Sequence, residues 1–477
     1  MDANSQNITG PVLFLDNLTD TTVEIAALFI APVGVPVPNV TAEGVSVPVE
    51  PLSEFRTATV WRARFRLPVG SQSGYDWNGK HYPVCCDFSD AIRIGYVSCN
   101  GEEIGDLDRE GSERNAMWSR LKSDHQHQAF ALLLHGGDQV YADEVTHGHT
   151  LSRDWPDDVP PDPSQADLAS LRDHLREGFY ERYASLYASP EFAWIAARVP
   201  SLMQWDDHDI CDGWGSLPAS KTHSGVGQTL FSVARESFLI FQQATTDDDL
   251  PGRFVDPDGL HLGWTVRTAA LRIIAPDLRS ERSRRAIMGP GGWTMLEEEA
   301  KDPMPGQTFL MSSVPLLGPR LSILEALMVA VPRMQKYEDD LRDQWQSRAH
   351  RAEWRRMLQL VRTMAIRDGH DLTVISGEIH LATRGTMDLG DGLHMHQLVA
   401  SGIAHRAPPK AWANILGALA WLGDAPLEGH PIQIHCLPGQ SSRYVAERNY
   451  LRLERGADSW SAIWELEDSG TTDPLAL

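Results

Sequence analysis

Short apolar runs that end in glycine or in a polar cluster recur along most of the chain. In the clearest of them, LLLHGGDQVYADE at 132–144, the apolar part stops at two glycines and Asp138 follows at once. An apolar run of this length closed by glycines is typical of a central strand with a tight turn at its carboxyl end. Ligand-binding groups of α/β sheets gather in the loops outside such ends. The pattern therefore places Asp138 where a metal-binding carboxylate would lie.

The same arrangement occurs five times between residue 91 and the C-terminal part of the chain. The polar clusters read SCNG from Ser98, GGDQVYAD from Gly136, WDDHDICD from Trp205, SGEIH from Ser376 and SGIAH from Ser401. Helical patterns lie between the runs, for example at 168–187 and 231–243. Strands that alternate with helices predict an α/β core.

Two other segments follow different patterns. The first 88 residues hold short strand-like runs at 12–15, 23–28 and 57–65, separated by turns rich in proline and glycine. They predict a small antiparallel β-sandwich, so we divide the chain into an N-terminal β-sandwich domain at 1–88 and an α/β domain at 89–477. A mostly helical segment is predicted at 321–364. We expect its charged run, Tyr337 to Asp343, to lie on a solvated face, with Tyr337 and Trp345 packed inward.

Composition and charge narrow the classes of protein. The formal charge of the 477 residues is −23 at pH 7, which argues against a nucleic-acid binder, because neutralising phosphates requires clustered Lys and Arg. Five cysteines give no disulfide framework and suggest a reducing compartment. The most apolar stretches, 323–331 and 411–422, are shorter than the roughly 18–20 residues that span a membrane.

The N-terminus has no basic stretch followed by an apolar one. We therefore expect a cytoplasmic protein, or a periplasmic or secreted one if a leader has been removed.

The five polar clusters together hold carboxylates, histidines, the phenol of Tyr141 and the thiol of Cys99. Oxygen ligands combined with one or two imidazoles suit two close divalent or trivalent ions. Two metals about 3.5–4 Å apart can hold a phosphoryl group and activate a water. One carboxylate must bridge the ions, because its negative charge offsets their repulsion, and Asp138 is our candidate for the bridge.

The motifs GGDQVYADE, WDDHD, SGEIH and the leading SC resemble those of the PhoD-like alkaline phosphatases, in the calcineurin-like metallophosphoesterase superfamily. The resemblance runs from about residue 91 to the C-terminus and includes YEDDLRDQW at 337–345 and RNYLRLE at 448–454. It implies an α/β metallophosphatase-type core of two packed sheets flanked by helices. The family also carries an N-terminal β-sandwich, which agrees with 1–88.

The resemblance also implies a set of metal ligands. By motif position these are Cys99, Asp138, Tyr141, Asp212, Glu378 and His380. Cys99 matches a thiolate ligand, Asp138 the bridging carboxylate and Tyr141 the phenolate of a ferric-type site. The implied cofactors are two metal ions, Fe(III) plus Ca(II) or another divalent ion. Asp212 and Glu378 replace the family's usual Asn and Asp, and both keep an oxygen donor.

Other interpretations stay open for several residues. Cys99 taken alone is also consistent with a buried structural thiol, and Tyr141 with a core aromatic whose hydroxyl is hydrogen-bonded. His208 is expected to bind the phosphate or protonate the leaving group, or else to orient a ligand together with Asp207. Arg279 is expected to bind substrate phosphate beside Asp207, or to form an ion pair within the protein.

The expected function is hydrolysis of phosphate mono- or diesters by a metal-bound hydroxide at a two-metal site, with Asp138 and His208 as catalytic groups. The chain would then be a phosphoric ester hydrolase acting on a small-molecule phosphoester. One alternative is a non-catalytic module that binds a phosphorylated ligand on the same fold. Another is a metal hydrolase for a non-phosphate ester. The substrate and the oligomeric state are left open.

Overall fold

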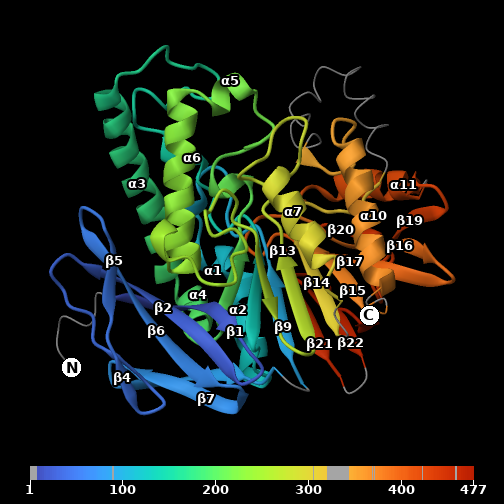
Figure 1. Cartoon of the computed structure of the whole chain (residues 1–477), viewed down its shortest axis with the longest axis horizontal. Helices are drawn as coiled ribbons and strands as arrows, with labels where there is room; N and C mark the ends of the chain where they lie inside the picture. Colours follow the sequence, from blue (N-terminus) through green and yellow to red (C-terminus); the bar gives the residue numbers. More distant parts are fainter. Residues whose placement is uncertain are drawn as a thin grey trace.

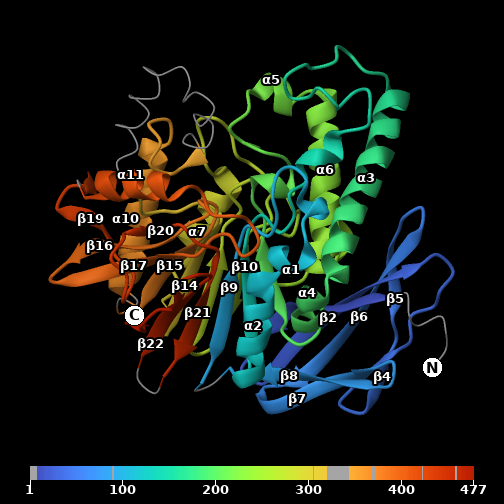
Figure 2. The same cartoon turned by 180° about the vertical axis from the view of Figure 1, so that it is seen from behind.

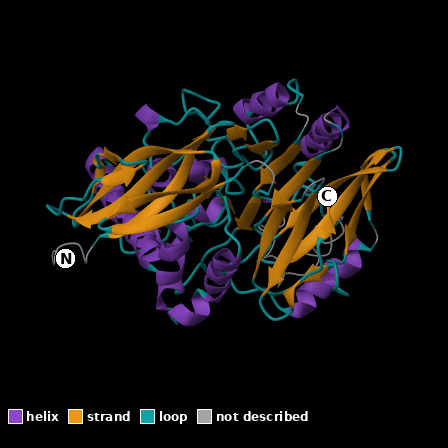
Figure 3. Ribbon diagram, turned by 90° about the horizontal axis from the view of Figure 1, so that it is seen from below, coloured by secondary structure: helices purple, strands orange, loops and turns teal. Residues whose placement is uncertain are grey.

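Three β-sheets organise the molecule. The computed structural model describes residues 8–88, 91–303, 306–319, 343–367, 369, 371–421, 423–456 and 459–477. In these parts of the chain the sheets have 11, nine and four strands. The N-terminal strands lie at one end of the molecule and the second sheet lies at the other (Figure 1, Figure 3).

The first sheet contains strands from both ends of the chain. Its spatial order is β23 (Gly470–Thr471), β22 (Trp460–Leu466), β21 (Asn449–Arg455), β9 (Arg93–Val97), β10 (Leu132–Gly136), β11 (Ser201–Gln204), β1 (Thr9–Leu18), β2 (Thr22–Pro32), β6 (Ala58–Pro68) and β5 (Glu50–Glu54), with β24 (Leu475–Ala476) on β22. Strands β9, β10 and β11 are parallel, and Leu133 lies opposite both Gly95 and Ser201. Their carboxyl ends therefore lie side by side at one edge.

The second sheet packs face to face against the first. Its order is β12 (Trp264–Arg267), β13 (Leu271–Ala275), β14 (Gln307–Ser312), β15 (Leu372–Ser376), β17 (Leu393–Val399), β16 (Ala382–Gly390), β19 (His430–His435) and β18 (Asp424–Leu427), with β20 (Tyr444–Val445) on β16. Trp464 Nε1 donates to the Val399 carbonyl at 2.9 Å, and the rings of Phe309 and Trp460 meet edge-on at 5.0 Å. These contacts join the two inner faces into one core.

Helices cover the outer faces of both large sheets (Figure 1, Figure 2). Beside the first sheet lie α1 (Gly111–Arg114), α2 (Ala116–His127), α3 (Gln165–Ala188), α4 (Pro190–Ala196), α6 (Gly225–Ser237) and the π-helix η5 (Phe238–Gln242), whereas α5 (Ala219–Thr222) packs on α6 away from the sheet (Figure 1). Beside the second lie α7 (Pro290–Glu299), α10 (Arg351–Arg367) and α11 (Lys410–Ala420), whose buried apolar residues form a second core. None of the described helices is both long and apolar enough to cross a membrane.

The predicted fold class is confirmed, including an all-β N-terminal region. Strands β3 (Val40–Ala42), β4 (Val45–Val47), β7 (Gly70–Trp77) and β8 (Lys80–Cys86) form the third sheet. The other N-terminal strands extend the first sheet, because β1 pairs in parallel with β11 through Phe14 and Ser201. The domain boundary at residue 88 stays a prediction.

Half of the helical segment predicted at 321–364 lies outside the described residues, which resume at Asp343; in the described half, α10 is helical as predicted. Trp345 is buried, as predicted. The prediction of a solvated Asp343 is wrong, since its side chain is buried and paired with Arg279 and Arg282. The buried guanidinium groups of Arg279 and Arg282 compensate the charge of the Asp343 carboxylate. These partners are distant along the chain, so a local sequence pattern does not reveal them.

Candidate metal centre

Loops from the two large sheets meet at the carboxyl ends of their parallel strands. The backbone N–H of Cys99 donates to the Gly137 carbonyl at 3.2 Å, and that of Asn100 to the Asp138 carbonyl at 2.8 Å. The N–H of His405 donates to the Cys99 carbonyl at 3.1 Å. The loops after β9, β10 and β17 are thus bonded to one another, which fixes the side chains that they carry.

Close approach of these loops depends on two glycines. At Gly377, the Cβ of any other residue would lie 2.3 Å from Ser98 Oγ. Gly137 has a φ of +110°, and a Cβ there would lie 2.6 Å from the Cβ of Asp206. Glycine is the residue that tolerates both the conformation and the contact. The glycines before Asp138 and Glu378 therefore have a steric cause.

Four site residues have left-handed backbone conformations although they are not glycine. They are Cys99 (φ 56°), Asp138 (φ 55°), Glu378 (φ 65°) and His380 (φ 54°). Such conformations cost of order 1–3 kcal/mol each and gather at functional sites, where the surrounding structure holds them in place. Here the four strained positions are four of the six predicted metal ligands.

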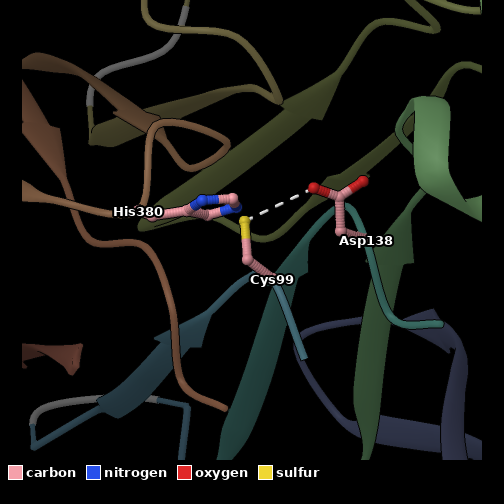
Figure 4. A group of neighbouring side chains, drawn as sticks. All are labelled: Cys99, Asp138 and His380. Carbon is pink, nitrogen blue, oxygen red and sulfur yellow. Dashed lines mark hydrogen bonds between the residues drawn. The ribbon is translucent and has the colours of Figure 1, made fainter. Parts of the chain in front are cut away.

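The first candidate ligand cluster consists of Cys99, Asp138 and His380 (Figure 4). One ligand atom from each lies within 4.8 Å of the other two, and the Cys99 thiol donates to Asp138 Oδ2 at 3.4 Å. Cys99 and Asp138 come from the first sheet, whereas His380 comes from the loop after β15 of the second. The cluster therefore spans the junction between the sheets.

The phenol of Tyr141 joins this cluster. Its hydroxyl lies 3.0 Å from His380 Nε2, and the whole side chain is buried. Burial raises the pKa of the Tyr141 phenol well above its usual value, and the charges of Cys99 and Asp138 raise it further. The predicted ligands Cys99, Asp138, Tyr141 and His380 are thus brought together.

Two further clusters lie along the same edge. Asp138, Asp206 and Asp207 form one, and Asp207, His208 and Asp212 form the other, again with ligand atoms within 4.8 Å of one another. Asp138 belongs to the first and second clusters, as a bridging carboxylate should. Asp207 belongs to the second and third. Asp206 was not among the residues selected from the sequence, although it lies in the same WDDHD motif.

The donor set fits cations. Asp138 Oδ1 and Asp206 Oδ2 are buried and have no hydrogen-bond partner among the described residues. A buried carboxylate oxygen without a partner is costly, and a cation would satisfy it. Burial and the charge of Asp206 raise the pKa of Asp138 well above its usual value, while burial, opposed by Arg279, raises the pKa of Asp206 to about 6. A cation would reverse both shifts, because it stabilises the ionised forms.

His208 is held in place by Asp143. His208 Nδ1 lies 2.9 Å from Asp143 Oδ2, and the imidazole faces the Tyr141 ring at a centroid distance of 4.3 Å. Burial alone would lower the pKa of His208, but the nearby carboxylates of Asp143 and Asp207 raise it well above its usual value. Asp143 Oδ1 also accepts the Asp212 backbone N–H at 2.7 Å, so one carboxylate positions two candidate functional residues.

Glu378 is predicted as a ligand but is not part of these three clusters. Its Oε2 accepts a hydrogen bond from Gln344 Nε2 at 2.7 Å. Burial, together with the charges of Asp343 and Asp206, raises the pKa of Glu378 well above its usual value. The carboxyl group therefore lies beside the site and is bonded to a neighbouring amide.

Arg279 binds carboxylates of the chain itself. Its Nε pairs with Asp206 Oδ1, its Nη2 lies 2.6 Å from Asp343 Oδ2 and 3.3 Å from Asp207 Oδ1, and its Nη1 donates to the Trp214 carbonyl at 2.9 Å. The side chain is fully buried. The predicted contact with substrate phosphate would require some of these bonds to break, whereas the observed contacts orient three acidic residues.

Asp209 is a positioning residue that the sequence interpretation missed. Its Oδ2 accepts the backbone N–H groups of Asp138 and Asp206, both at 2.9 Å. Its Oδ1 accepts those of Gln139 and Val140 at 3.0 and 3.2 Å. One buried carboxylate thus fixes the loops after β10 and β11 relative to each other. The signal was present, since Asp209 is the last residue of WDDHD.

Comparison with known proteins gives a family match. Residues 99–338 match the family model described as PhoD related phosphatase. The uncharacterized protein YGR266W of Saccharomyces cerevisiae is 23% identical over 374 residues, which cover 66% of this chain and 53% of the yeast protein. The chain thus spans about half the length of that curated relative.

One solved structure supports the fold. A structure titled "Structure of PhoD" superposes with a TM-score of 0.60 at 11% identity and covers 99% of this chain and 88% of that chain. A dimetal phosphatase from Danio rerio gives a TM-score of 0.33 at 10% identity, covering 81% of this chain and 99% of that one. This second similarity is too low to carry an inference, while the first agrees with the two-sheet architecture.

Proposed function

The chain belongs to the PhoD-related phosphatase family, and from this and the geometry of its site we propose that it hydrolyses phosphate mono- or diesters at a two-metal centre. The observation that carries the proposal is the position of Asp138. Its carboxylate belongs to two ligand clusters, and its Oδ1 has no hydrogen-bond partner among the described residues. A carboxylate in this position is suited to bridge two cations.

The residues divide into two ligand groups. We assign the first ion to Cys99, Asp138, Tyr141 and His380, and the second to Asp138, Asp206 and Asp207. Asp212, which clusters with Asp207, and Glu378 remain further proposed ligands of the second ion. Sulfur, phenolate and imidazole donors favour iron at the first position, and an all-oxygen set favours calcium or another hard divalent ion at the second. When bound, the ions would neutralise charge on the phosphoryl oxygens and acidify the attacking water.

His208 and Arg279 have different roles in this proposal. Because Asp143 engages His208 Nδ1, the other ring nitrogen, Nε2, is the atom that would donate a proton to the leaving group or to a phosphate oxygen. Although burial alone would lower the pKa of His208, the carboxylate of Asp143 raises it, which favours the protonated ring. Arg279 holds Asp206 in position, so its effect on catalysis would be indirect.

Turnover of a panel of phosphate mono- and diesters tests the proposal. The 477-residue chain is loaded with iron together with calcium, manganese or zinc and compared with Asp138→Asn. We expect turnover by the wild type and none above background by the variant. Asp173→Asn, at an exposed position on α3, makes the same chemical change away from the site and should leave turnover unaltered. Equal turnover by Asp138→Asn and wild type would contradict the proposal.

One observation favours a second candidate function, a non-catalytic module that binds a phosphorylated ligand. Glu378 is bonded to Gln344 and lies outside the three ligand clusters, so the second ion has one predicted ligand fewer in position. Binding of phosphate esters without turnover, despite full metal loading, would support this function. Turnover of any ester in the panel would exclude it.

A further inference from the structure

A cavity of about 300 Å³ borders the candidate metal centre at Tyr141. Its walls come from residues 100–115, the loop 139–141 after β10, and the C-terminal end of α3. Tyr141 is shared by the two sites, since its hydroxyl contacts His380 and the residue also lines the cavity. The family match and the proposed function give no role to this cavity.

The lining contains more cationic than anionic side chains. It includes three arginines, Arg109, Arg114 and Arg182, whose side chains are 4%, 11% and 7% exposed. Among the described residues that line the cavity, Asp106 is the one carboxylate. Carboxylates outside the lining also pair with these arginines: Glu102 and Glu113 with Arg109, and Glu144 with Arg182.

Asp106 is already engaged by two of the three arginines. Its oxygens accept from Arg114 Nη2 at 2.8 Å and from Arg109 Nη1 at 3.3 Å. Arg109 is further paired with Glu113 at 2.9 Å. The distance from Asp106 to Arg182 is 4.0 Å, which is too long for a hydrogen bond. Arg182 is thus the one of the three arginines that has an ion pair with Asp106 but no hydrogen bond to it.

One N–H group of Arg182 lacks a hydrogen-bond acceptor among the described residues. Its Nη2 donates to the Tyr141 carbonyl at 2.5 Å. Its Nη1 is buried and has no hydrogen-bond partner among the described residues; the nearest carboxylate, that of Glu144, lies 3.7 Å away and outside the lining. Burial lowers the pKa of Arg182 despite the neighbouring carboxylates of Asp106 and Glu144. A buried guanidinium in this condition is stabilised by an anion that accepts from it.

We propose that this cavity binds a small oxyanion, such as phosphate or a carboxylate, through Arg182. Arg109 and Arg114 add positive charge, and Asn115 and Ser189 supply neutral polar groups at the wall. The anion would contact Tyr141, whose hydroxyl touches the candidate metal centre, yet it would not share a ligand atom with the clusters around Asp138. The inference does not depend on the proposed phosphatase activity.

Calorimetric titration with inorganic phosphate tests the site in the full-length Asp138→Asn protein, freed of metal with a chelator. This background removes phosphate binding through ions at the metal centre. We expect one phosphate per chain. Arg182→Gln in the same background should weaken binding roughly tenfold or more, because a charge-assisted hydrogen bond is lost. The matched control is Arg172→Gln, also on α3, whose guanidinium pairs with Glu236; it should leave the affinity unchanged.

Arg182→Gln could misfold, since Arg182 also donates a hydrogen bond to the Tyr141 carbonyl. A second variant therefore tests the site without changing Arg182. Ser185 is exposed and lines the cavity, so Ser185→Glu adds a negative charge there without disturbing the core. It should also weaken phosphate binding roughly tenfold by like-charge repulsion. Absence of phosphate binding to the Asp138→Asn protein, or equal affinity in Ser185→Glu and Arg172→Gln, would overturn the proposal.

Discussion

Asp209 shows how one residue can set the geometry of a site without being a predicted ligand. It accepts backbone N–H groups from both acidic loops and the side-chain amide of Gln242 at 2.8 Å. Gln242 belongs to the π-helix η5, and π-helical turns occur frequently at functional sites. Asp209, itself hydrogen-bonded to Gln242, thus fixes the backbone of Asp138 and Asp206.

The first prediction concerns Asp209→Asn. An amide presents a donor where the carboxylate accepts, so the loops carrying Asp138 and Asp206 should separate. Replacing a residue that orients metal ligands typically lowers the metal affinity 10–100-fold, and we expect Asp209→Asn to lower it by roughly this factor. Competition with a chelator of known affinity measures it.

The control is Asp256→Asn. Asp256 also accepts three backbone N–H groups within a loop, but it lies away from the candidate site. This variant should keep the wild-type metal affinity. Equal metal affinity for Asp209→Asn and Asp256→Asn would contradict the positioning role.

The second prediction concerns His208 as proton donor. His208→Gln should lower kcat by roughly 10²–10⁴-fold for an alkyl phosphate, whose alkoxide leaves poorly without a proton. The loss should be much smaller for 4-nitrophenyl phosphate, because 4-nitrophenolate leaves unprotonated. Steady-state kinetics with both esters measure the difference. Equal losses would instead indicate that His208 acts by binding the phosphate or by orienting a neighbouring group.

At the scale of elements, strand β10 carries Asp138 at its end and a buried histidine within it. His135 is fully buried, with its ring nitrogens 2.6 Å from Gln139 Oε1 and 3.1 Å from Ser201 Oγ. Burial lowers the pKa of His135 to about 4. The folded protein therefore contains the neutral ring, while the unfolded chain binds a proton at the ordinary value of about 6.5.

The third prediction follows from this difference. Protonation favours the unfolded chain, so the contribution of His135 is complete above about pH 6.5 and is lost as the pH falls toward 4. One pKa unit corresponds to 1.36 kcal/mol, so the free energy of unfolding should fall by about 3 kcal/mol more in wild type than in His135→Gln between pH 7 and pH 4. Urea unfolding of the metal-free proteins measures it.

His127→Gln, at an exposed position at the end of α2, provides the control. Its free energy of unfolding should follow the wild-type pH dependence. If the free energy of unfolding of His135→Gln also followed the wild-type pH dependence, the conclusion that His135 is neutral in the folded protein would be contradicted.

The sequence predicts elements better than it predicts their partners. The ends of β9, β10, β11 and β15 were found because each apolar run stops at a glycine or polar cluster. The partners of Arg279 could not be found this way, since Asp206 and Asp343 lie 73 and 64 residues away along the chain. Burial of Asp343 and the parallel pairing of β1 with β11 were missed for the same reason: both depend on how distant elements pack.

At the scale of the whole molecule, the candidate metal centre joins the two large sheets. Cys99 and Asp138 follow strands of the first sheet, and His380 follows a strand of the second. Cations bound by all three would link the sheets directly. The acidic residues gathered there repel one another, so bound cations should also relieve this repulsion.

The fourth prediction is that removing metal lowers the Tm. A cation that binds the folded state at 100 times its Kd stabilises that state by about 2.7 kcal/mol. Differential scanning calorimetry before and after chelation should therefore show a loss of a few degrees, restored by adding metal back. Adding metal to the metal-free Asp138→Asn protein should not raise its Tm. Unchanged unfolding of wild type upon chelation would argue against a metal link between the sheets.

Elemental analysis of protein purified without added metal shows whether Asp138 bridges two ions. We expect about two ions per chain in wild type and the loss of both in Asp138→Asn, because this carboxylate belongs to both ligand groups. Two ions retained by Asp138→Asn, or no uptake by wild type of iron, calcium, manganese or zinc, would contradict the bridging role.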